Sequence, residues 1–216
     1  MVAPRVNEGL LQIAGVDEVG RGALFGPVVA AAVILLPVAA ERLVKVGVKD
    51  SKQLRAADRE ILYETIKTHA VAFCIGMASV REIDRMNILQ ASLLAMRRAV
   101  MRLSITPDLC LIDGNRAIPA FAIDQRTIVK GDQREPAIAA ASILAKVWRD
   151  RLLVRLDRRY PGYHLASNKG YGSRAHQLAL ETLGPSPQHR LSFSPCQRSL
   201  FQSPPQPAIS PAIPML

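Results

Sequence analysis

The feature that most constrains this chain is a pair of adjacent carboxylates placed between two apolar runs. Asp17 and Glu18 follow the apolar run 11–16, and a second run, 28–36, begins shortly after a Gly-Arg-Gly turn at 20–22. The runs predict two buried strands, and the short connection favours antiparallel pairing. Two acids at the edge of a hydrophobic element are costly unless a cation meets them. The turn offers backbone N–H groups around one arginine, so the stretch favours a metal ion beside a phosphate.

The rest of the chain alternates between helical and extended patterns. We expect helices over 55–68, after Asn87, from Pro136 onward and over 173–183, and further strands over 71–78, 107–112 and 127–130. Asn87 and Gln90 resemble a capping box. The helical stretch 137–145 carries no charge, which predicts burial on all sides. The order of these elements predicts an α/β fold with a mixed sheet.

Length and composition favour one domain. The chain has 216 residues, of which 49% are hydrophobic, enough for a single packed core. We expect an N-terminal extension at 1–10 and a disordered, proline-rich tail at 201–216. No apolar run is long enough to cross a bilayer. Cys74, Cys110 and Cys196 form no CxxC pair, which suits a reducing, cytoplasmic setting.

The charge balance points to a polyanionic partner. The formal net charge is +10, and nucleic acid is the commonest partner of such basic chains. Charge alone leaves two alternatives open, which are simple solubility and binding to a membrane surface.

Acids recur where the predicted strands end, at Asp17, Glu18, Asp113 and Asp132. Strand ends in α/β sheets border ligand clefts, so we treat the four as one cluster. Converging carboxylates repel one another unless cations neutralise them, and Mg²⁺ or Mn²⁺ prefers oxygen ligands. Two such ions roughly 4 Å apart can hold the attacking and leaving oxygens of a phosphodiester. Histidine and cysteine lack zinc-like spacing, which disfavours zinc.

Each acid also has a simpler interpretation. The dipeptides at 113–114 and 131–132 are common in turns. Asp17 and Glu18 point to opposite faces of a regular strand, and they share a site only if the strand ends or bulges there. The rival acids are Asp50, Asp124 and Asp150, and the last is flanked by arginines, as a salt-bridged helix residue would be.

Seven motifs, taken in order, resemble those of the ribonuclease HII family, the type 2 ribonucleases H. They are Gly15-Val16-Asp17-Glu18-Val19-Gly20-Arg21-Gly22, Asp50-Ser51-Lys52, Leu111-Ile112-Asp113-Gly114-Asn115, Val129-Lys130-Gly131-Asp132, Ala140-Ala141-Ser142-Ile143-Leu144-Ala145-Lys146-Val147 with Arg149-Asp150, Lys169-Gly170-Tyr171, and His189-Arg190-Leu191-Ser192-Phe193. One motif alone would be a weak signal, whereas this many in register make chance agreement negligible.

The resemblance implies a ribonuclease H-like mixed sheet flanked by helices, in a domain spanning 11–200 with a small helical C-terminal part over about 160–200. The implied substrates are the RNA strand of RNA·DNA hybrids and a single ribonucleotide embedded in duplex DNA. Cleavage would fall 5′ of the ribonucleotide and leave 3′-hydroxyl and 5′-phosphate ends, with Mn²⁺ or Mg²⁺ as cofactor. By motif match, the catalytic and metal-binding acids would be Asp17, Glu18, Asp113 and Asp132.

The same matches imply a set of substrate-binding residues. The backbone of Gly20, Arg21 and Gly22 would read the ribose 2′-hydroxyl, which alone separates RNA from DNA at one nucleotide. Tyr171 would pack on the sugar at the RNA–DNA junction, although it otherwise reads as an ordinary loop aromatic. Ser142 either contacts substrate or bonds to the carbonyl one turn back. Phosphates would be held by lysines whose simpler interpretation is a solvated surface: Lys52, Lys130, Lys146 and Lys169.

Two positions depart from the family pattern. Ala23 stands where the family often has proline, and Gln53 stands where it often has a second lysine, which removes one possible phosphate contact. Two competing functions share the acids or the charge: a non-catalytic basic module that binds hybrid or structured RNA, and a metal-dependent nucleotidyl or phosphoryl transferase on the same fold. We expect a monomer.

Overall fold

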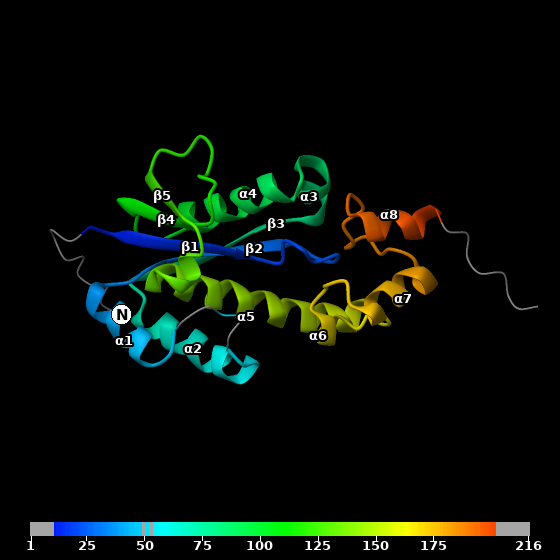
Figure 1. The fold of residues 1–216 in the computed structure, drawn as a ribbon, viewed down its shortest axis with the longest axis horizontal. Helices are drawn as coiled ribbons and strands as arrows, with labels where there is room; N and C mark the ends of the chain where they lie inside the picture. Colours follow the sequence, from blue (N-terminus) through cyan, green and yellow to red (C-terminus); the bar gives the residue numbers. More distant parts are fainter. Residues whose placement is uncertain (1–10, 49–50, 52–53, 202–216) are drawn as a thin grey trace, which may run out of the picture.

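The protein, seen in a computed structural model, is built on one five-stranded mixed sheet (Figure 1). The structure describes residues 11–48, 51 and 54–201, so the predictions for 1–10, Asp50, Lys52, Gln53 and 202–216 lie outside the described residues. The strand order is β3-β2-β1-β4-β5. The strands are β1 Ile13–Val19, β2 Val28–Ile34, β3 Ala72–Ala78, β4 Leu109–Asp113 and β5 Asp124–Ile128.

Helices cover both faces of the sheet. On one face lie α1 Pro37–Lys45, α2 Ala56–His69 and the long α5 Pro136–Arg159, and on the other lie α3 Val80–Met86 and α4 Ile88–Met101 (Figure 1). A 3₁₀ turn, η2 Gly131–Gln133, precedes α5. Beyond the end of α5, α6 Leu165–Asn168, α7 Arg174–Leu183 and α8 Ser194–Phe201 form a small helical part at one end of the molecule.

The strand β2, in the interior of the sheet, is apolar along its whole length and is buried on both sides. Its alternate residues enter two separate cores, one shared with α4 and one shared with α5. Glycine brings the helices close to the strands. A Cβ on Gly15 of β1 would lie 2.1 Å from the backbone of Ala137 in α5, and one on Gly76 of β3 would lie 2.2 Å from the Ala95 carbonyl in α4. Both glycines therefore allow backbone-to-backbone packing that any larger residue would block.

The predicted α/β class with a mixed sheet is confirmed. β1 and β2 pair antiparallel, β1 and β4 pair parallel, and Pro136 begins α5 as expected. The prediction that the charge-free stretch in α5 is buried on all sides holds for residues 138–145. No helix in the described part of the chain is both long and apolar enough to cross a bilayer.

Two local predictions differ from the structure, and two helices were not predicted. The strand expected at 127–130 is β5 at 124–128, and Lys130 already lies in the left-handed region with φ of 55°. Asn87 does cap α4 by accepting from the Gln90 N–H, but the complete capping box lies one helix earlier, between Ser79 and Glu82 of α3. The short helices α1 and α3 were not expected.

Candidate active site

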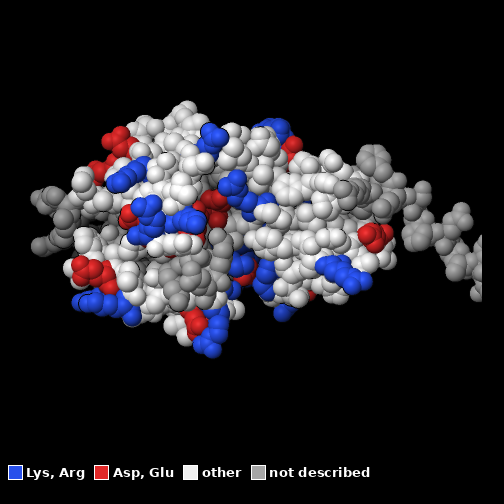
Figure 2. All heavy atoms as spheres, in the orientation of Figure 1, with Lys and Arg blue, Asp and Glu red and all other residues white. Residues whose placement is uncertain are grey.

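Three carboxylates meet where the pairing of β1 with β4 ends. The last parallel pair joins Val16 to Ile112, so one further step along the register brings Asp17 beside Asp113. One ligand oxygen from each of Asp17, Glu18 and Asp113 lies within 4.8 Å of the others. Residues almost a hundred positions apart in the sequence thus form a single acidic cluster. Figure 2 shows acidic atoms near the middle of this face, with Lys and Arg on either side.

Asp17 is the most enclosed member of the cluster. Its side chain is buried on the α5 side of β1, where Oδ1 accepts from the Glu18 N–H at 2.7 Å and the carboxylate hydrogen-bonds to Ser142. The Ser142 hydroxyl in turn lies 2.9 Å from that of Ser51. Burial raises the pKa of Asp17 well above its ordinary value, and the charges of Glu18 and Asp113 raise it further.

Glu18 reaches the cluster from the other face of the same strand. It lines a second hollow of about 250 Å³ whose wall includes Leu89 and Met96 of α4. Burial raises its pKa, while Arg21 opposes that shift by donating from Nη1 to Glu18 Oε1 at 3.0 Å. The two acids do point to opposite sides, as a regular strand requires. The shared site forms because the pairing of β1 with β4 ends at Val16, although the pairing of β1 with β2 continues to Val19.

The donor set fits a hard divalent cation. All three ligands are carboxylate oxygens, which Mg²⁺ and Mn²⁺ prefer. Burial raises the pKa values of Asp17 and Glu18, so both carboxylates are costly to ionise at this position. Arg21 is partly exposed and pairs with Glu18. Asp17, Glu18 and Asp113 are therefore the side chains that would hold a metal ion.

Asp132 lies beside this group rather than within it. It is buried in η2, and its neighbour Gly131 donates its backbone N–H to Asp113 Oδ1 at 2.8 Å. Among the described residues, the cluster of potential ligands contains the other three acids and not Asp132. The structure therefore places Asp132 one residue from an anchor of Asp113, and its metal-binding role stays a prediction.

The Gly-Arg-Gly turn and Tyr171 border the same cavity as the acids. Ala23 forms an isolated antiparallel bridge with Tyr171, which ties the end of the turn to the C-terminal helical part. The cavity has a volume of about 390 Å³. Its lining combines most of the predicted site: Asp17, Glu18, Gly20, Arg21, Gly22, Asp113, Ser142, Lys146 and Tyr171, together with Val19 and Ser51.

Two buried arginines hold these elements in place. Arg149 of α5 donates to the carbonyls of Phe25, Pro27 and Lys169, and its guanidinium lies 5.6 Å from the Tyr171 ring centroid. Arg190 donates to the carbonyls of Gly26 and Arg21. Burial, with a smaller contribution from Arg149, lowers the pKa of Arg190 to about 9. The arginines thereby join the segment after the turn to the segment before Tyr171.

The predicted lysines fall in different places. Lys146 lines the acid cavity, with Nζ 5.9 Å from the Tyr171 ring centroid and 2.9 Å from Asp150 Oδ1. Lys130 is exposed in the turn after β5. Lys169 donates to the Ala166 carbonyl and lines a separate groove. The structure thus brings only Lys146 to the acids, and phosphate binding by all three stays a prediction.

Comparison with known proteins identifies the family. Residues 14–196 match the family model described as Ribonuclease HII. This chain belongs to the ribonuclease HII family. Ribonuclease HII of Acaryochloris marina is 69% identical over 190 residues, covering 88% of this chain and 96% of the relative. That of Trichodesmium erythraeum is 61% identical, covering 88% and 90%. The crystal structure of ribonuclease H2 from Pyrococcus horikoshii superposes with a TM-score of 0.73 at 27% identity, covering 88% of this chain and 97% of that one.

As a member of the ribonuclease HII family, the protein is a metal-dependent ribonuclease. Sequence reasoning quoted Ser51, Arg149 and Arg190 within motifs but gave none of them a role. The role of Ser51 near Asp17, and that of the two buried arginines, can be recognised only once the positions of the surrounding helices and strands are known. Burial at these positions could not be read from the local pattern because arginine is normally exposed.

Proposed function

We propose that this ribonuclease hydrolyses the RNA strand of RNA·DNA hybrids and incises 5′ of single ribonucleotides embedded in duplex DNA, by two-metal-ion chemistry. Products would carry 3′-hydroxyl and 5′-phosphate ends. The observation that carries the proposal is the sharing of one cavity by the three acids, the Gly-Arg-Gly turn and Tyr171. The acids supply sites for cations, and the turn with the tyrosine supplies a means of recognising one ribose.

Divalent cations, Mn²⁺ or Mg²⁺, would supply activation of water and charge stabilisation at the scissile phosphate. Residues of the chain bind these cations and orient the side chains that hold them. Asp17, Glu18 and Asp113 hold the cations, and we propose that Asp132 completes the set when substrate is bound. Ser142 fixes the orientation of the Asp17 carboxylate by hydrogen bonding. Arg21 is half-exposed and restrains Glu18.

Discrimination of RNA from DNA would come from the turn at 20–22. Gly20 has φ of 88°, and a Cβ there would lie 2.3 Å from Arg149 Nε, so only glycine fits. This close packing leaves backbone groups at the cavity surface, within reach of a 2′-hydroxyl. Tyr171 stands across the bridge from Ala23, where its ring can pack on the neighbouring deoxyribose. The departure at Ala23 keeps this bridge, because Ala23 is buried and pairs through its backbone.

One assay tests the proposal. Duplex DNA containing one ribonucleotide and an all-DNA control are incubated with and without Mn²⁺ or Mg²⁺. We expect cleavage of the first substrate only, with metal only, 5′ of the ribonucleotide. Tyr171→Ala should slow cleavage at the lone ribonucleotide by at least about tenfold while a hybrid with several ribonucleotides is less affected. Binding without product in every metal would instead support a non-catalytic hybrid-binding module, and cleavage of both duplexes would remove the role of the turn.

Domain boundaries, assembly and location also remain proposals. We propose that residues 11–200 form one domain, with the proline-rich segment 201–216 as an appended tail, and that the enzyme acts as a cytoplasmic monomer. Size-exclusion chromatography with light scattering tests the assembly: a mass close to 23.6 kDa supports a monomer, and twice that mass contradicts it.

A further inference from the structure

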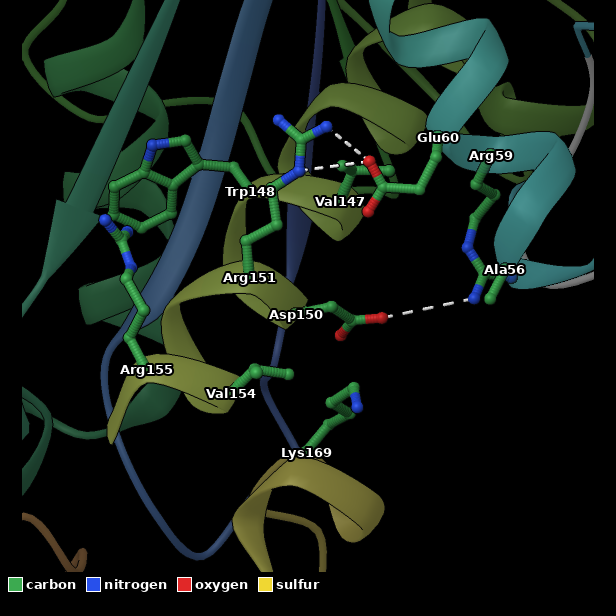
Figure 3. Close-up of a pocket in the computed structure, with 10 residues that line it drawn as sticks. All are labelled: Ala56, Arg59, Glu60, Val147, Trp148, Asp150, Arg151, Val154, Arg155 and Lys169. Carbon is green, nitrogen blue, oxygen red and sulfur yellow. Dashed lines mark hydrogen bonds and ion pairs between the residues drawn. The ribbon is translucent and has the colours of Figure 1, made fainter. Parts of the chain in front are cut away.

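A larger hollow lies beside the candidate active site, between α2 and α5. This α2–α5 groove has a volume of about 620 Å³ and is bounded at one end by Lys169, after α6 (Figure 3). Its lining is contributed by three segments: Ala56, Arg59 and Glu60 of α2, Val147, Trp148, Asp150, Arg151, Val154 and Arg155 of α5, and Lys169. Of these residues, the motif match implies a role in substrate binding for Lys169 alone.

The charged side chains of the groove leave an excess of positive charge. Four cations and two acids line it, and both acids are engaged inside the protein. Glu60 accepts from Arg151 Nε at 3.0 Å, and Asp150 Oδ1 lies 2.9 Å from Lys146 Nζ. Arg59 lies 4.0 Å from Asp150 and points toward it in Figure 3. Lys169 donates to a carbonyl rather than to an acid, and Arg155 is exposed.

The groove continues the candidate active site along one helix. Ser142 and Lys146 line the acid cavity, and Asp150 and Val154 line the groove. These four residues recur every fourth position on α5, so they form one stripe running from the acids into the groove. The ion pair between Lys146 and Asp150 spans the boundary between the two hollows.

We propose that the α2–α5 groove binds the sugar–phosphate backbone of the same duplex, beyond the nucleotides held at the acids. The inference rests on the proposed function and extends it with a second contact region. A positively charged hollow that adjoins a nuclease cavity matches the charge of a phosphate backbone. Apolar surface on which sugars can pack is offered by Val154, which is 42% exposed, and by the partly buried Trp148.

Helix geometry sets the reach of this contact. Nine residues separate Lys146 from Arg155, which corresponds to about 14 Å along α5 at 1.5 Å per residue. Each base pair advances a strand by about 3.4 Å, so for a duplex that runs along α5, Arg155 lies about four base pairs beyond Lys146. A duplex that ends closer than this to the ribonucleotide, on the side that enters the groove, cannot reach Arg155.

Arg155 is the residue to change, because it is exposed and lies outside the acid cavity. Binding of a labelled duplex containing one ribonucleotide is followed by fluorescence anisotropy over a salt series, in EDTA so that no cleavage occurs. Arg155→Ala should weaken binding about threefold to tenfold and reduce the slope of log K against log salt by about 0.9. Arg155→Lys should restore the slope, since a lysine also neutralises a phosphate. The matched control is Arg81→Ala, an exposed arginine of α3 on the opposite face of the sheet.

A second arm uses duplex length. Substrates carry flanks of about twelve base pairs on both sides, or a flank of about two base pairs on one side. We expect the penalty of Arg155→Ala to disappear when one particular flank is shortened and to persist when the other is shortened.

The outcomes separate the two proposals. If Arg155→Ala matches Arg81→Ala in salt slope, or if its penalty is independent of both flanks, the groove does not bind the duplex and the inference fails, while cleavage by the wild type still supports the proposed function. If the wild type cleaves no ribonucleotide-containing duplex, the proposed function itself fails.

Discussion

Two groups of like charges lie on either side of the Gly-Arg-Gly turn: the acids around Asp17 and the buried pair Arg149 and Arg190. The two groups differ in how their charges are compensated. On one side, burial and mutual repulsion raise the pKa values of Asp17 and Glu18. On the other side, burial lowers the pKa values of Arg149 and Arg190. The arginines donate to five backbone carbonyls, so all three nitrogens of Arg149 and two of the three of Arg190 find partners within the chain, while Nη2 of Arg190 is buried without one.

This difference in compensation indicates that the acids form a binding site, whereas the buried arginines support the fold. Buried arginines that bond to carbonyls complete the fold without any ligand. Among the described residues, the three acids accept from Ser142, from Arg21 and from the backbone N–H groups of Glu18 and Gly131. Arg21 is the one charged donor of these, so negative charge is left for a cation to balance. Like-charge clusters are thus informative about function only when the compensating groups are counted.

The largest change in the free energy of unfolding is expected from replacing Arg149, one of the two buried arginines. Arg149→Met leaves the carbonyls of Phe25, Pro27 and Lys169 without their donor, which should lower the free energy of unfolding by at least about 3 kcal/mol. Urea denaturation followed by circular dichroism measures the change. The control is Arg151→Met on the same helix, whose exposed pair with Glu60 should contribute less than about 1 kcal/mol. Equal losses in the two variants would mean that the buried arginine is not a structural support.

A smaller change, in this case an increase in the free energy of unfolding, is expected from replacing the buried acid Asp17. Asp17→Asn removes a buried charge from a repulsive cluster, so the metal-free variant should be more stable than the wild type by about 1 kcal/mol at pH 7. Because the folded-state pKa of Asp17 lies above its ordinary value of 3.8, the folded protein binds the proton more readily. The advantage of the variant should therefore shrink as the pH falls from 7 toward 4. Thermal unfolding in EDTA over this range measures it, and a variant less stable than the wild type at pH 7 would contradict the account.

The smallest effect is expected where opposite charges meet at the surface. Glu82 caps α3 and pairs with Arg98, and these contacts lower its pKa to about 2. Glu82→Gln should cost about 0.5–1 kcal/mol at pH 7. A lowered pKa stabilises the fold above the ordinary value of 4.5, so the difference from the wild type should disappear as the pH falls from 4.5 to about 2. Glu64→Gln, which disrupts exposed ion pairs only, is the control and should change stability less.

Much of the fold could be predicted because its patterns are local. Pro136 and the charge-free stretch after it indicated the start and the burial of α5. The edge strand β5 was misplaced because Asp124, Gln125 and Arg126 are polar, so neither an apolar run nor an alternation marks it. The apolar run 28–36 predicted one strand, but β2 ends at Ile34 and Pro37 begins α1.

The candidate site was predictable to a lesser extent. The sequence could indicate Asp17, Glu18 and Asp113 as one group because each follows an apolar strand. It could not show that Asp132 lies beside them, since the η2 turn sets its direction. Asp150 is salt-bridged as expected, but its partners are Lys146 and Arg59 rather than the flanking arginines, because neighbours on a helix point to different sides.

The central claim is that the three acids together trap divalent cations beside the Gly-Arg-Gly turn. Calorimetric titration of Mn²⁺ into the metal-free protein tests it most directly, with Asp113→Asn as the variant and Asp58→Asn, an exposed acid of α2 paired with Arg55, as the control. We predict saturable binding to the wild type and to Asp58→Asn, weakened at least about tenfold in Asp113→Asn. Equal affinity in all three proteins would contradict the account.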